Sequence, residues 1–263
     1  VGGKHVIYNL FMSSINPEDE VVIPSPYWVS YPDIVSLCRG TPVLIESDPK
    51  NKFKITPQKL EEKINKNTKW FIINSPCNPT GTVYSKEELF QISKVLINNP
   101  HVNILSDDIY EHIIYGNQKF YNILNVAPDL YERTFIVNGV SKAFSMTGWR
   151  IGYGAGNEKL IKSIAKIQSQ STTNPCSISQ MAAKFALEKK KTFLSEWIKQ
   201  FEERKNFLIN FFGSINQFEV INPDGAFYLF VGCEGFIQKK TPDGKIISND
   251  VDFAEFILAD SKV

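Results

Sequence analysis

The stretch Val137–Gly152 reads VNGVSKAFSMTGWRIG, and it places one lysine among small and polar residues directly after an apolar, β-rich run. Arg150 follows Lys142 eight residues later. A lysine held in such surroundings can serve as a nucleophilic amine, and the planar guanidinium group of an arginine suits a dianionic phosphate. Because most lysines are solvated, the stretch by itself also fits an ordinary surface lysine.

Two further segments repeat this arrangement of polar residues after an apolar run. They are NSPCNPTG at 74–81 and SDDIYE at 106–111. In open α/β sheets, ligands bind in the crevice outside the carboxyl ends of the strands. We therefore expect Asn78, Asp107 and Lys142 to meet in one pocket, although they lie far apart in the sequence.

Short β-rich runs alternate with helical patterns along most of the chain, which is typical of an α/β domain around a largely parallel sheet. The predicted strands are 20–23, 42–46, 70–73, 102–106, 134–138 and 151–155. The predicted helices between them are 4–14, 29–38, 57–65, 86–97 and 158–169. Ser85 with Glu88 predicts a capping box, and Thr56-Pro57 predicts a cap followed by proline in the first turn.

The remainder of the chain has a different organisation. Long helical patterns at 176–188 and 192–212 are followed by two runs, 218–221 and 226–231, which predict a strand pair about a turn at 222–225. An exposed turn at 239–244 and the start of a terminal helix at 252–258 complete the pattern. We expect a large domain over 1–190, then a linking helix and part of a smaller α+β domain over 191–263.

Composition limits the possible function classes. The 263 residues are 43% hydrophobic and 22% charged, which favours a folded globular protein over a disordered one. With 29 Lys+Arg against 28 Asp+Glu, the net charge of +1 predicts neither a nucleic acid nor an acidic membrane surface as partner. The run at 189–191 is interpreted as a solvated helix junction, and no apolar run is long enough to span a bilayer.

The cysteines and histidines show no ligand or disulfide spacing. Four cysteines lie far apart: Cys38, Cys77, Cys176 and Cys233. This spacing favours a reducing cytoplasm. The acidic group around 107–112 offers oxygen ligands and one imidazole, but a cofactor site is the favoured interpretation, and no metal is predicted.

With SPYWVSY at 25–31 and SQST at 169–172 added to the earlier blocks, the chain resembles the class I aminotransferases, which use pyridoxal 5'-phosphate. The resemblance is to the bacterial aspartate aminotransferases and runs through the whole chain. It implies a fold type I transferase and a homodimer with a shared site. It also implies that an N-terminal segment and a C-terminal stretch of the family, with the arginine for the substrate α-carboxylate, lie outside 1–263.

The resemblance implies a role for each motif residue. Lys142 stands at the position of the lysine that forms the Schiff base with the cofactor. Asp107 is expected to hold the proton on the pyridine nitrogen, because the spacing Asp-x-x-Tyr selects it over Asp108. An ordinary helix N-cap is the alternative role for Asp107. Tyr110 and Asn78 are expected to donate to the phenolic oxygen of the ring, which lowers the pKa of the Schiff base.

The remaining expected contacts are to the ring face, the phosphate and the substrate. Trp28 is expected to stack on the ring, whereas Tyr27 and Tyr31 are expected only to pack. The phosphate site is predicted at the start of the first helix, with Gly2, Gly3, Ser141 and Arg150. Lys4 is the candidate for the distal carboxylate of the substrate and is expected to share in phosphate binding, and Trp28 and Asn78 are expected to contact the substrate as well.

Glycines stand at two informative places around Lys142, at position 139 and in a run from 152 to 156. Many relatives have a serine three residues before the lysine, and Gly139 stands there in this chain, so one phosphate hydroxyl is expected to be absent. The run Gly152, Gly154, Gly156 lacks a dinucleotide-binding context and is interpreted as close backbone packing.

The sequence thus predicts an aminotransferase that moves an amino group between aspartate and 2-oxoglutarate. Three alternatives stay open: a prephenate or aromatic aminotransferase, a β-lyase, and a regulatory module. The first two enzymes use the same scaffold. A regulatory module that senses the cofactor would need a basic helix-turn-helix domain, and the charge pattern of this chain does not predict one.

Overall fold

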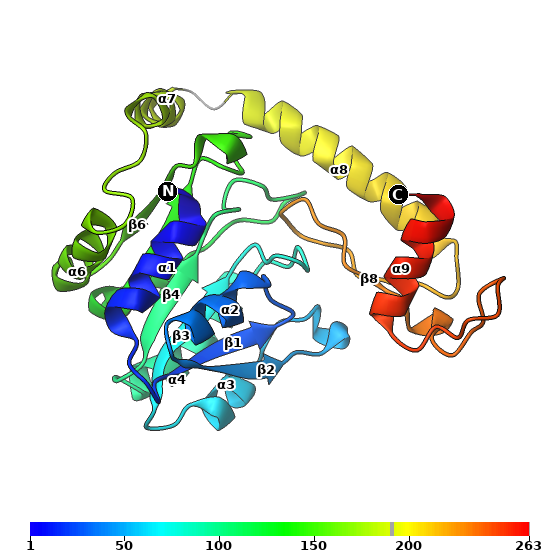
Figure 1. The fold of residues 1–263 in the computed structure, drawn as a ribbon, viewed down its shortest axis with the longest axis horizontal. Helices are drawn as coiled ribbons and strands as arrows, with labels where there is room; N and C mark the ends of the chain where they lie inside the picture. Colours follow the sequence, from blue (N-terminus) through cyan, green and yellow to red (C-terminus); the bar gives the residue numbers. More distant parts are fainter. Residues whose placement is uncertain (190–191, 263) are drawn as a thin grey trace.

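The computed structural model describes residues 1–189 and 192–262, and its centre is a six-stranded sheet in the order β2-β1-β3-β4-β5-β6 (Figure 1). The strands are β1 Glu20–Ser25, β2 Thr41–Glu46, β3 Thr68–Asn74, β4 Asn103–Asp107, β5 Thr134–Gly139 and β6 Gly152–Ala155. Neighbouring strands are parallel except for the antiparallel pair β5–β6. The predicted largely parallel sheet is confirmed.

Helices cover both faces of this sheet. The helices of this layer are α1 Gly2–Ser14, α2 Ser30–Leu37, α3 Pro57–Lys63, α4 Lys86–Asn98, α5 Ile123–Val126 and α6 Glu158–Ser169. Successive strand residues point to opposite faces, so Val21 and Ile23 pack with α1, α2 and α6, whereas Val22 packs with α3, α4 and α5. The apolar core therefore lies in two layers, one on each side of the sheet.

The predicted helix caps are confirmed. The Ser85 side chain accepts from the Glu88 backbone N–H at 3.2 Å, and the Glu88 carboxylate accepts from the Ser85 backbone N–H at 2.7 Å. Thr56 accepts from the backbone N–H of Lys59, with Pro57 in the first turn of α3. These bonds satisfy donors that a helix start leaves without partners.

The glycines of β6 allow close backbone packing, as predicted. A Cβ atom on Gly152 would collide with the backbone of Gly2 and Gly3, and one on Gly154 would collide with the ring of Phe135. The first turn of α1 therefore lies directly against β6, which brings the start of that helix beside the segment that follows β5.

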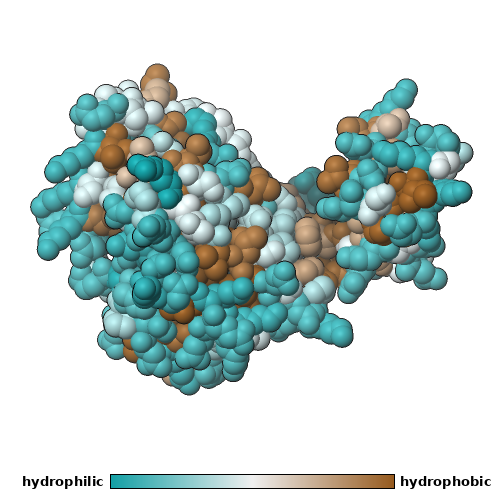
Figure 2. Space-filling view, turned by 60° about the horizontal axis from the view of Figure 1, so that its bottom comes forward, coloured by the Kyte–Doolittle hydropathy of each residue, from teal (hydrophilic) through white to brown (hydrophobic). Residues whose placement is uncertain are grey.

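The later part of the chain extends away from the sheet. It consists of α7 Ser177–Glu188, α8 Thr192–Gly213, β7 Glu219–Val220, β8 Val231–Gly232 and α9 Asp250–Ser261. Figure 1 shows α8 with one end near α7 and the other near β8 and α9, and Figure 2 shows a larger and a smaller body joined by a narrower neck. The predicted domain boundary at 190–191 and two lysines of the 189–191 run lie outside the described residues, so the division into two domains stays a prediction.

A strand pair is present in this region, as predicted, but the predicted bounds 226–231 of its second strand and the turn at 222–225 are wrong. Glu219–Val220 pairs with Val231–Gly232 in antiparallel register. In the 221–230 segment, the backbone N–H groups of Asp224 and Gly225 donate to the Gly81 carbonyl, and that of Ala226 donates to the Ile113 carbonyl. The segment finds its hydrogen-bond partners in loops of the large sheet, and therefore it does not form a short hairpin.

The described residues contain neither a membrane-spanning candidate nor a metal-ligand cluster. None of the helices in this part of the chain combines the length and apolar character needed to cross a bilayer. Within 1–189 and 192–262, no group of three or more His, Cys, Asp or Glu side chains could hold a metal ion.

The packing of α4 gives a matched test of the core. Ile92 is 1% exposed, whereas Ile97 on the same helix is 47% exposed. We expect Ile92→Ala to lower the free energy of unfolding by roughly 2–5 kcal/mol, because it opens a cavity under the sheet. Ile97→Ala should change it by less than about 0.5 kcal/mol. Urea denaturation measures both, and equal losses would contradict the two-layer core.

Candidate active site

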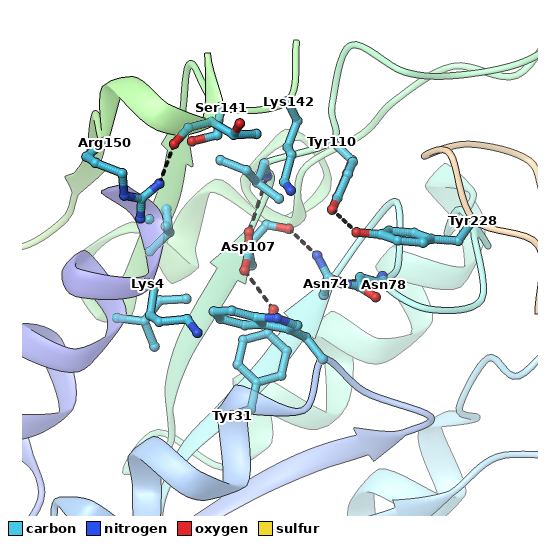
Figure 3. A pocket seen from close by; sticks show the side chains of 16 residues that line it. Lys4, Tyr31, Asn74, Asn78, Asp107, Tyr110, Ser141, Lys142, Arg150 and Tyr228 are labelled. Carbon is cyan, nitrogen blue, oxygen red and sulfur yellow. Dashed lines mark hydrogen bonds between the residues drawn. The ribbon is translucent and has the colours of Figure 1, made fainter. Parts of the chain in front are cut away.

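A cavity of about 220 Å³ opens at the carboxyl ends of β3, β4 and β5 (Figure 3). Apart from Tyr228, the residues that line it come from the motifs at 25–31, 74–81, 106–111 and 137–152 and from the first helix, whereas SQST at 169–172 contributes none. The lining residues are Gly3, Lys4, Ile7, Trp28, Tyr31, Asn74, Asn78, Asp107, Ile109, Tyr110, Val137, Ser141, Lys142, Thr147, Arg150 and Tyr228. Gly2 lies just behind this lining, against the Arg150 guanidinium. The residues predicted for the site are therefore brought together, while the role of each stays a prediction.

Asp107 is the last residue of β4 and is 5% exposed. Its Oδ2 accepts from the Tyr31 hydroxyl at 2.7 Å, and its Oδ1 accepts from the Ile109 backbone N–H at 3.2 Å. Burial raises the pKa of Asp107, while these two bonds and the Lys142 ammonium act to lower it. None of the described helices begins at Asp107, so the alternative role as a helix N-cap is not supported.

Asp108 lies in a separate environment. Its Oδ1 accepts from the Ser106 hydroxyl at 2.7 Å, and its Oδ2 accepts from the Asn122 amide, whose own oxygen caps α5. Burial, with the nearby carboxylates of Asp107 and Glu111, raises the pKa of Asp108 to about 7. Asp108 is absent from the cavity lining. Of the two adjacent carboxyl groups, therefore, Asp107 lines the cavity and Asp108 contacts Ser106 and Asn122.

Lys142 projects into the cavity from the loop after β5. Its Nζ atom lies 5.7 Å from the ring centre of Tyr110 and 5.5 Å from that of Phe227. Burial lowers the pKa of Lys142, the Arg150 charge lowers it further, and the Asp107 carboxylate opposes both. The amine thus loses its proton more readily than an ordinary lysine, as a nucleophile requires.

Asn78 and Tyr110 line the side of the cavity that lies away from Lys4 and Arg150 (Figure 3). The Asn78 backbone N–H donates to Asn74 Oδ1 at 2.8 Å, and Asn74 Nδ2 donates to the Asp107 carbonyl at 2.9 Å. This pair of bonds ties the loop after β3 to the end of β4. Tyr110 is buried, and its hydroxyl shares a hydrogen bond with the Tyr228 hydroxyl, so its pKa is raised well above the ordinary value.

Arg150 lies at the start of α1, where backbone N–H groups have no helical partner. Its Nη1 donates to the Thr147 carbonyl at 2.7 Å, and Gly2 leaves room for the guanidinium because any Cβ there would collide with it. A Cβ on Gly139 would lie 2.9 Å from the Ile151 carbonyl oxygen, so β6 leaves little room for a serine at that position. Glycine at position 139 therefore fits this close backbone packing.

Lys4 and Trp28 line the cavity next to each other. The Lys4 Nζ atom lies 5.1 Å from the centre of the Trp28 ring. The Trp28 ring meets Tyr31 edge-on, with ring centres 5.3 Å apart. The Lys4 ammonium group therefore lies next to the aromatic pair of Trp28 and Tyr31.

Seven of the lining residues were not predicted from the sequence, and three of them, Tyr31, Asn74 and Tyr228, form hydrogen bonds of their side chains inside the site. Tyr31 was expected only to pack, but it also donates to Asp107. Asn74 and Tyr228 were assigned no role. The Asn-x-x-x-Asn spacing of Asn74 and Asn78 is a weak signal for the first loop, whereas Tyr228 was hidden inside a segment predicted to be a strand.

Taken together, fold and site define a doubly covered α/β sheet with a lysine, a buried carboxylate and an arginine around one cavity. The model of the family "Aminotransferase class I and II" matches residues 1–260. The chain therefore belongs to this family, and the predicted resemblance and fold type are confirmed.

Relatives and solved structures agree with this assignment. The chain is 54% identical over 262 residues to a probable aspartate/prephenate aminotransferase of Rickettsia felis and 46% identical to an aspartate aminotransferase of Rhizobium meliloti. Each match covers 100% of this chain and 64% of the relative, so the chain spans less than two thirds of their length.

Two solved structures share the fold. The crystal structure of the aspartate aminotransferase from Rhizobium meliloti superposes with a TM-score of 0.96 at 46% identity, covering 99% of this chain and 65% of that one. The aspartate aminotransferase from Thermus thermophilus with maleate superposes with a TM-score of 0.84 at 38% identity, covering 88% and 60%.

Members of this family use pyridoxal 5'-phosphate, and the lining of the cavity fits that group. The charged residues of the described lining are Lys4, Lys142 and Arg150 against Asp107. A dianionic phosphate suits Arg150 and the free N–H groups of α1. A protonated ring nitrogen suits the buried Asp107 carboxylate, and an aldehyde suits the amine of Lys142.

The electrostatics of Lys142 can be tested without cofactor. We expect Arg150→Met to raise the pKa of Lys142 and Asp107→Asn to lower it, each by roughly 0.5–1 unit, because one removes a like charge and the other an opposite charge. The pH dependence of Lys142 acetylation, followed by mass spectrometry, gives this pKa in each variant. Shifts of the opposite sign would contradict the geometry described for the cavity.

Proposed function

We propose that the protein containing this chain is a pyridoxal-phosphate-dependent aminotransferase that moves an amino group between aspartate and 2-oxoglutarate. The observation that carries the proposal is the placement of Lys142 and Asp107 in one cavity whose lining also carries two cationic side chains, Lys4 and Arg150. Two cationic side chains suit the anionic groups of this reaction, which are a cofactor phosphate and the carboxylates of a dicarboxylic substrate.

Bound in this cavity, pyridoxal 5'-phosphate supplies an aldehyde and a ring that withdraws electrons from the substrate. Lys142 would hold the cofactor through its amine, and the same amine, when free, would take the proton from the substrate Cα. Asp107, fixed by Tyr31, holds the proton on the ring nitrogen. Tyr110 and Asn78 donate to the phenolic oxygen, which favours a reactive, unprotonated linkage to Lys142 near neutral pH.

The remaining residues bind and orient. Arg150, Ser141, Gly2 and Gly3 hold the phosphate at the start of α1. Trp28 supplies a flat apolar surface for the ring face. Because oriented reactants avoid an entropic cost, these contacts contribute to rate as well as to affinity.

Lys4 is proposed to bind the distal carboxylate of aspartate or glutamate, and it lies beside Trp28 in the cavity lining. The Rickettsia relatives are named for both aspartate and prephenate, which favours prephenate as a second candidate substrate. Prephenate also carries a second carboxylate, so Lys4 suits either molecule. Turnover with aspartate, prephenate and tyrosine as alternative substrates separates these activities.

We further propose a homodimer in the cytoplasm. One face of α7 exposes Ile178, Met181 and Phe185, each more than 60% exposed, at the spacing of a continuous helical stripe. A second copy of the chain that covers this stripe would remove apolar surface from water. The four cysteines are all free thiols, which suits a reducing compartment.

The function is tested most simply at the lysine. We expect Lys142→Ala to lower the turnover of aspartate with 2-oxoglutarate by at least about 10²–10⁴-fold, because the group that moves the Cα proton is lost. Cofactor can still bind through its phosphate contacts, which visible absorption measures. Lys162→Ala, an exposed lysine of α6, is the control and should retain full activity. Near-normal turnover by Lys142→Ala would remove Lys142 from the mechanism.

The two adjacent carboxylates give a second test. We expect Asp107→Ala to lose more activity than Asp108→Ala, because only Asp107 faces the cavity, whereas Asp108 bonds Ser106 and Asn122. Rates are compared per folded molecule, with the folded fraction taken from circular dichroism. The reverse order would mean that the wrong carboxylate had been assigned to the ring nitrogen.

A further inference from the structure

The hydroxyl groups of Tyr110 and Tyr228 form a hydrogen bond inside the cavity, although the residues are 118 positions apart (Figure 3). Tyr228 belongs to the 221–230 segment, orange in Figure 1, which reaches back from the β7–β8 pair to the loops at the sheet edge. The same segment brings Phe227 against Tyr110 and Lys142, with ring centres of Phe227 and Tyr110 5.4 Å apart. It therefore forms part of the wall around the lysine.

Backbone bonds hold the segment in this position. The Gly81 carbonyl accepts from Asp224 and Gly225, so the segment is fixed to the loop that also carries Asn78. The Tyr115 hydroxyl donates to the Ala226 carbonyl, and the Ala226 backbone N–H donates to Ile113. Ala226 is fully buried and has a left-handed backbone with φ +56°, an unfavourable conformation for a side chain that the surrounding bonds must maintain.

Side chains add a second attachment on the other side of the segment. Lys52 Nζ lies 3.1 Å from Asp224 Oδ1, and the rings of Phe53 and Phe230 meet edge-on with centres 5.3 Å apart. Both ends of the segment are thus tied to the loop before α3. The chain is therefore attached on both sides of Tyr228, and these attachments hold its hydroxyl at one position in the cavity.

The direction of the Tyr110–Tyr228 bond follows from the proton that Tyr110 must give. A tyrosine hydroxyl has one proton to donate and can accept at its oxygen. If Tyr110 donates to the phenolic oxygen of the cofactor, Tyr228 must donate to Tyr110. A hydroxyl that accepts a hydrogen bond becomes a stronger donor, because bonds in a chain polarise one another.

We propose that Tyr228 is a positioning residue that acts through Tyr110: its hydroxyl orients and polarises the Tyr110 hydroxyl toward the phenolic oxygen of the cofactor. The proposal rests on the proposed function, since it assigns Tyr110 a cofactor contact. It makes the 221–230 segment, and not only the loops of the large sheet, part of what sets the acidity of the cofactor held by Lys142.

The test is a double-mutant cycle with a spectroscopic readout. Tyr228→Phe, Tyr110→Phe and the double variant are prepared as cofactor-loaded protein, and the pKa of the Lys142-linked chromophore is titrated by visible absorption. Both Phe variants keep the aromatic ring, so packing is retained. We expect Tyr228→Phe to raise this pKa by roughly 0.3–0.5 unit and Tyr110→Phe by roughly 0.5–1 unit, since each weakens or removes donation to the ring oxygen.

The double variant decides whether Tyr228 acts through Tyr110. We expect its chromophore pKa to equal that of Tyr110→Phe alone, and Tyr131→Phe, an exposed tyrosine, to leave the value unchanged. An unchanged pKa in Tyr228→Phe, or additive shifts in the double variant, would overturn the proposal. A wild-type protein that forms no chromophore on Lys142 would instead overturn the proposed function, so the two failures are distinguishable.

Discussion

The structure depends on a carboxylate that is held inside the protein at the end of a buried strand. Asp107 loses most of its contact with water, which costs free energy unless other donors replace it. The Tyr31 hydroxyl and the Ile109 backbone N–H supply two such donors, and the Lys142 amine lies across the same cavity. The cavity thus holds the Asp107 carboxylate in a fixed position and, across from it, the Lys142 amine with a lowered pKa.

Strand geometry explains why two neighbouring aspartates differ. Side chains alternate along a strand, so Asp107 and Asp108, at the end of β4, face different parts of the molecule. Asp107 faces the side of the sheet that α1 and α2 cover, where the Tyr31 hydroxyl at the start of α2 donates to it. Asp108 faces the side of α5, where Ser106 and Asn122 bond it. A shift of one residue in the register of β4 would exchange the two environments.

The predictions from sequence succeeded where local pattern and topology act together. Apolar runs located the six strands of the sheet, and the parallel order then placed Asn78, Asp107 and Lys142 at one edge. The caps at Thr56 and Ser85 were predictable because each involves residues three positions apart. In these cases the information lies within a few residues of the feature itself.

The predictions failed where a bond joins distant parts of the chain. The 221–230 segment has the composition of a hairpin, but Gly81 and Ile113 offer its backbone better partners than its own ends do. Tyr228 could not be assigned to the site for that reason. Tyr31 looked like a packing residue because nothing in its local sequence reveals that its hydroxyl reaches Asp107, 76 positions away.

The central claim is that the Lys142 amine, facing the Asp107 carboxylate, is where this protein attaches its cofactor. Borohydride reduction of the protein loaded with pyridoxal 5'-phosphate, followed by peptide mapping, tests it most directly, because reduction makes the attachment permanent. The account predicts one pyridoxyl group per chain, on Lys142. A label on another lysine, or no label on a protein that transaminates, would contradict it.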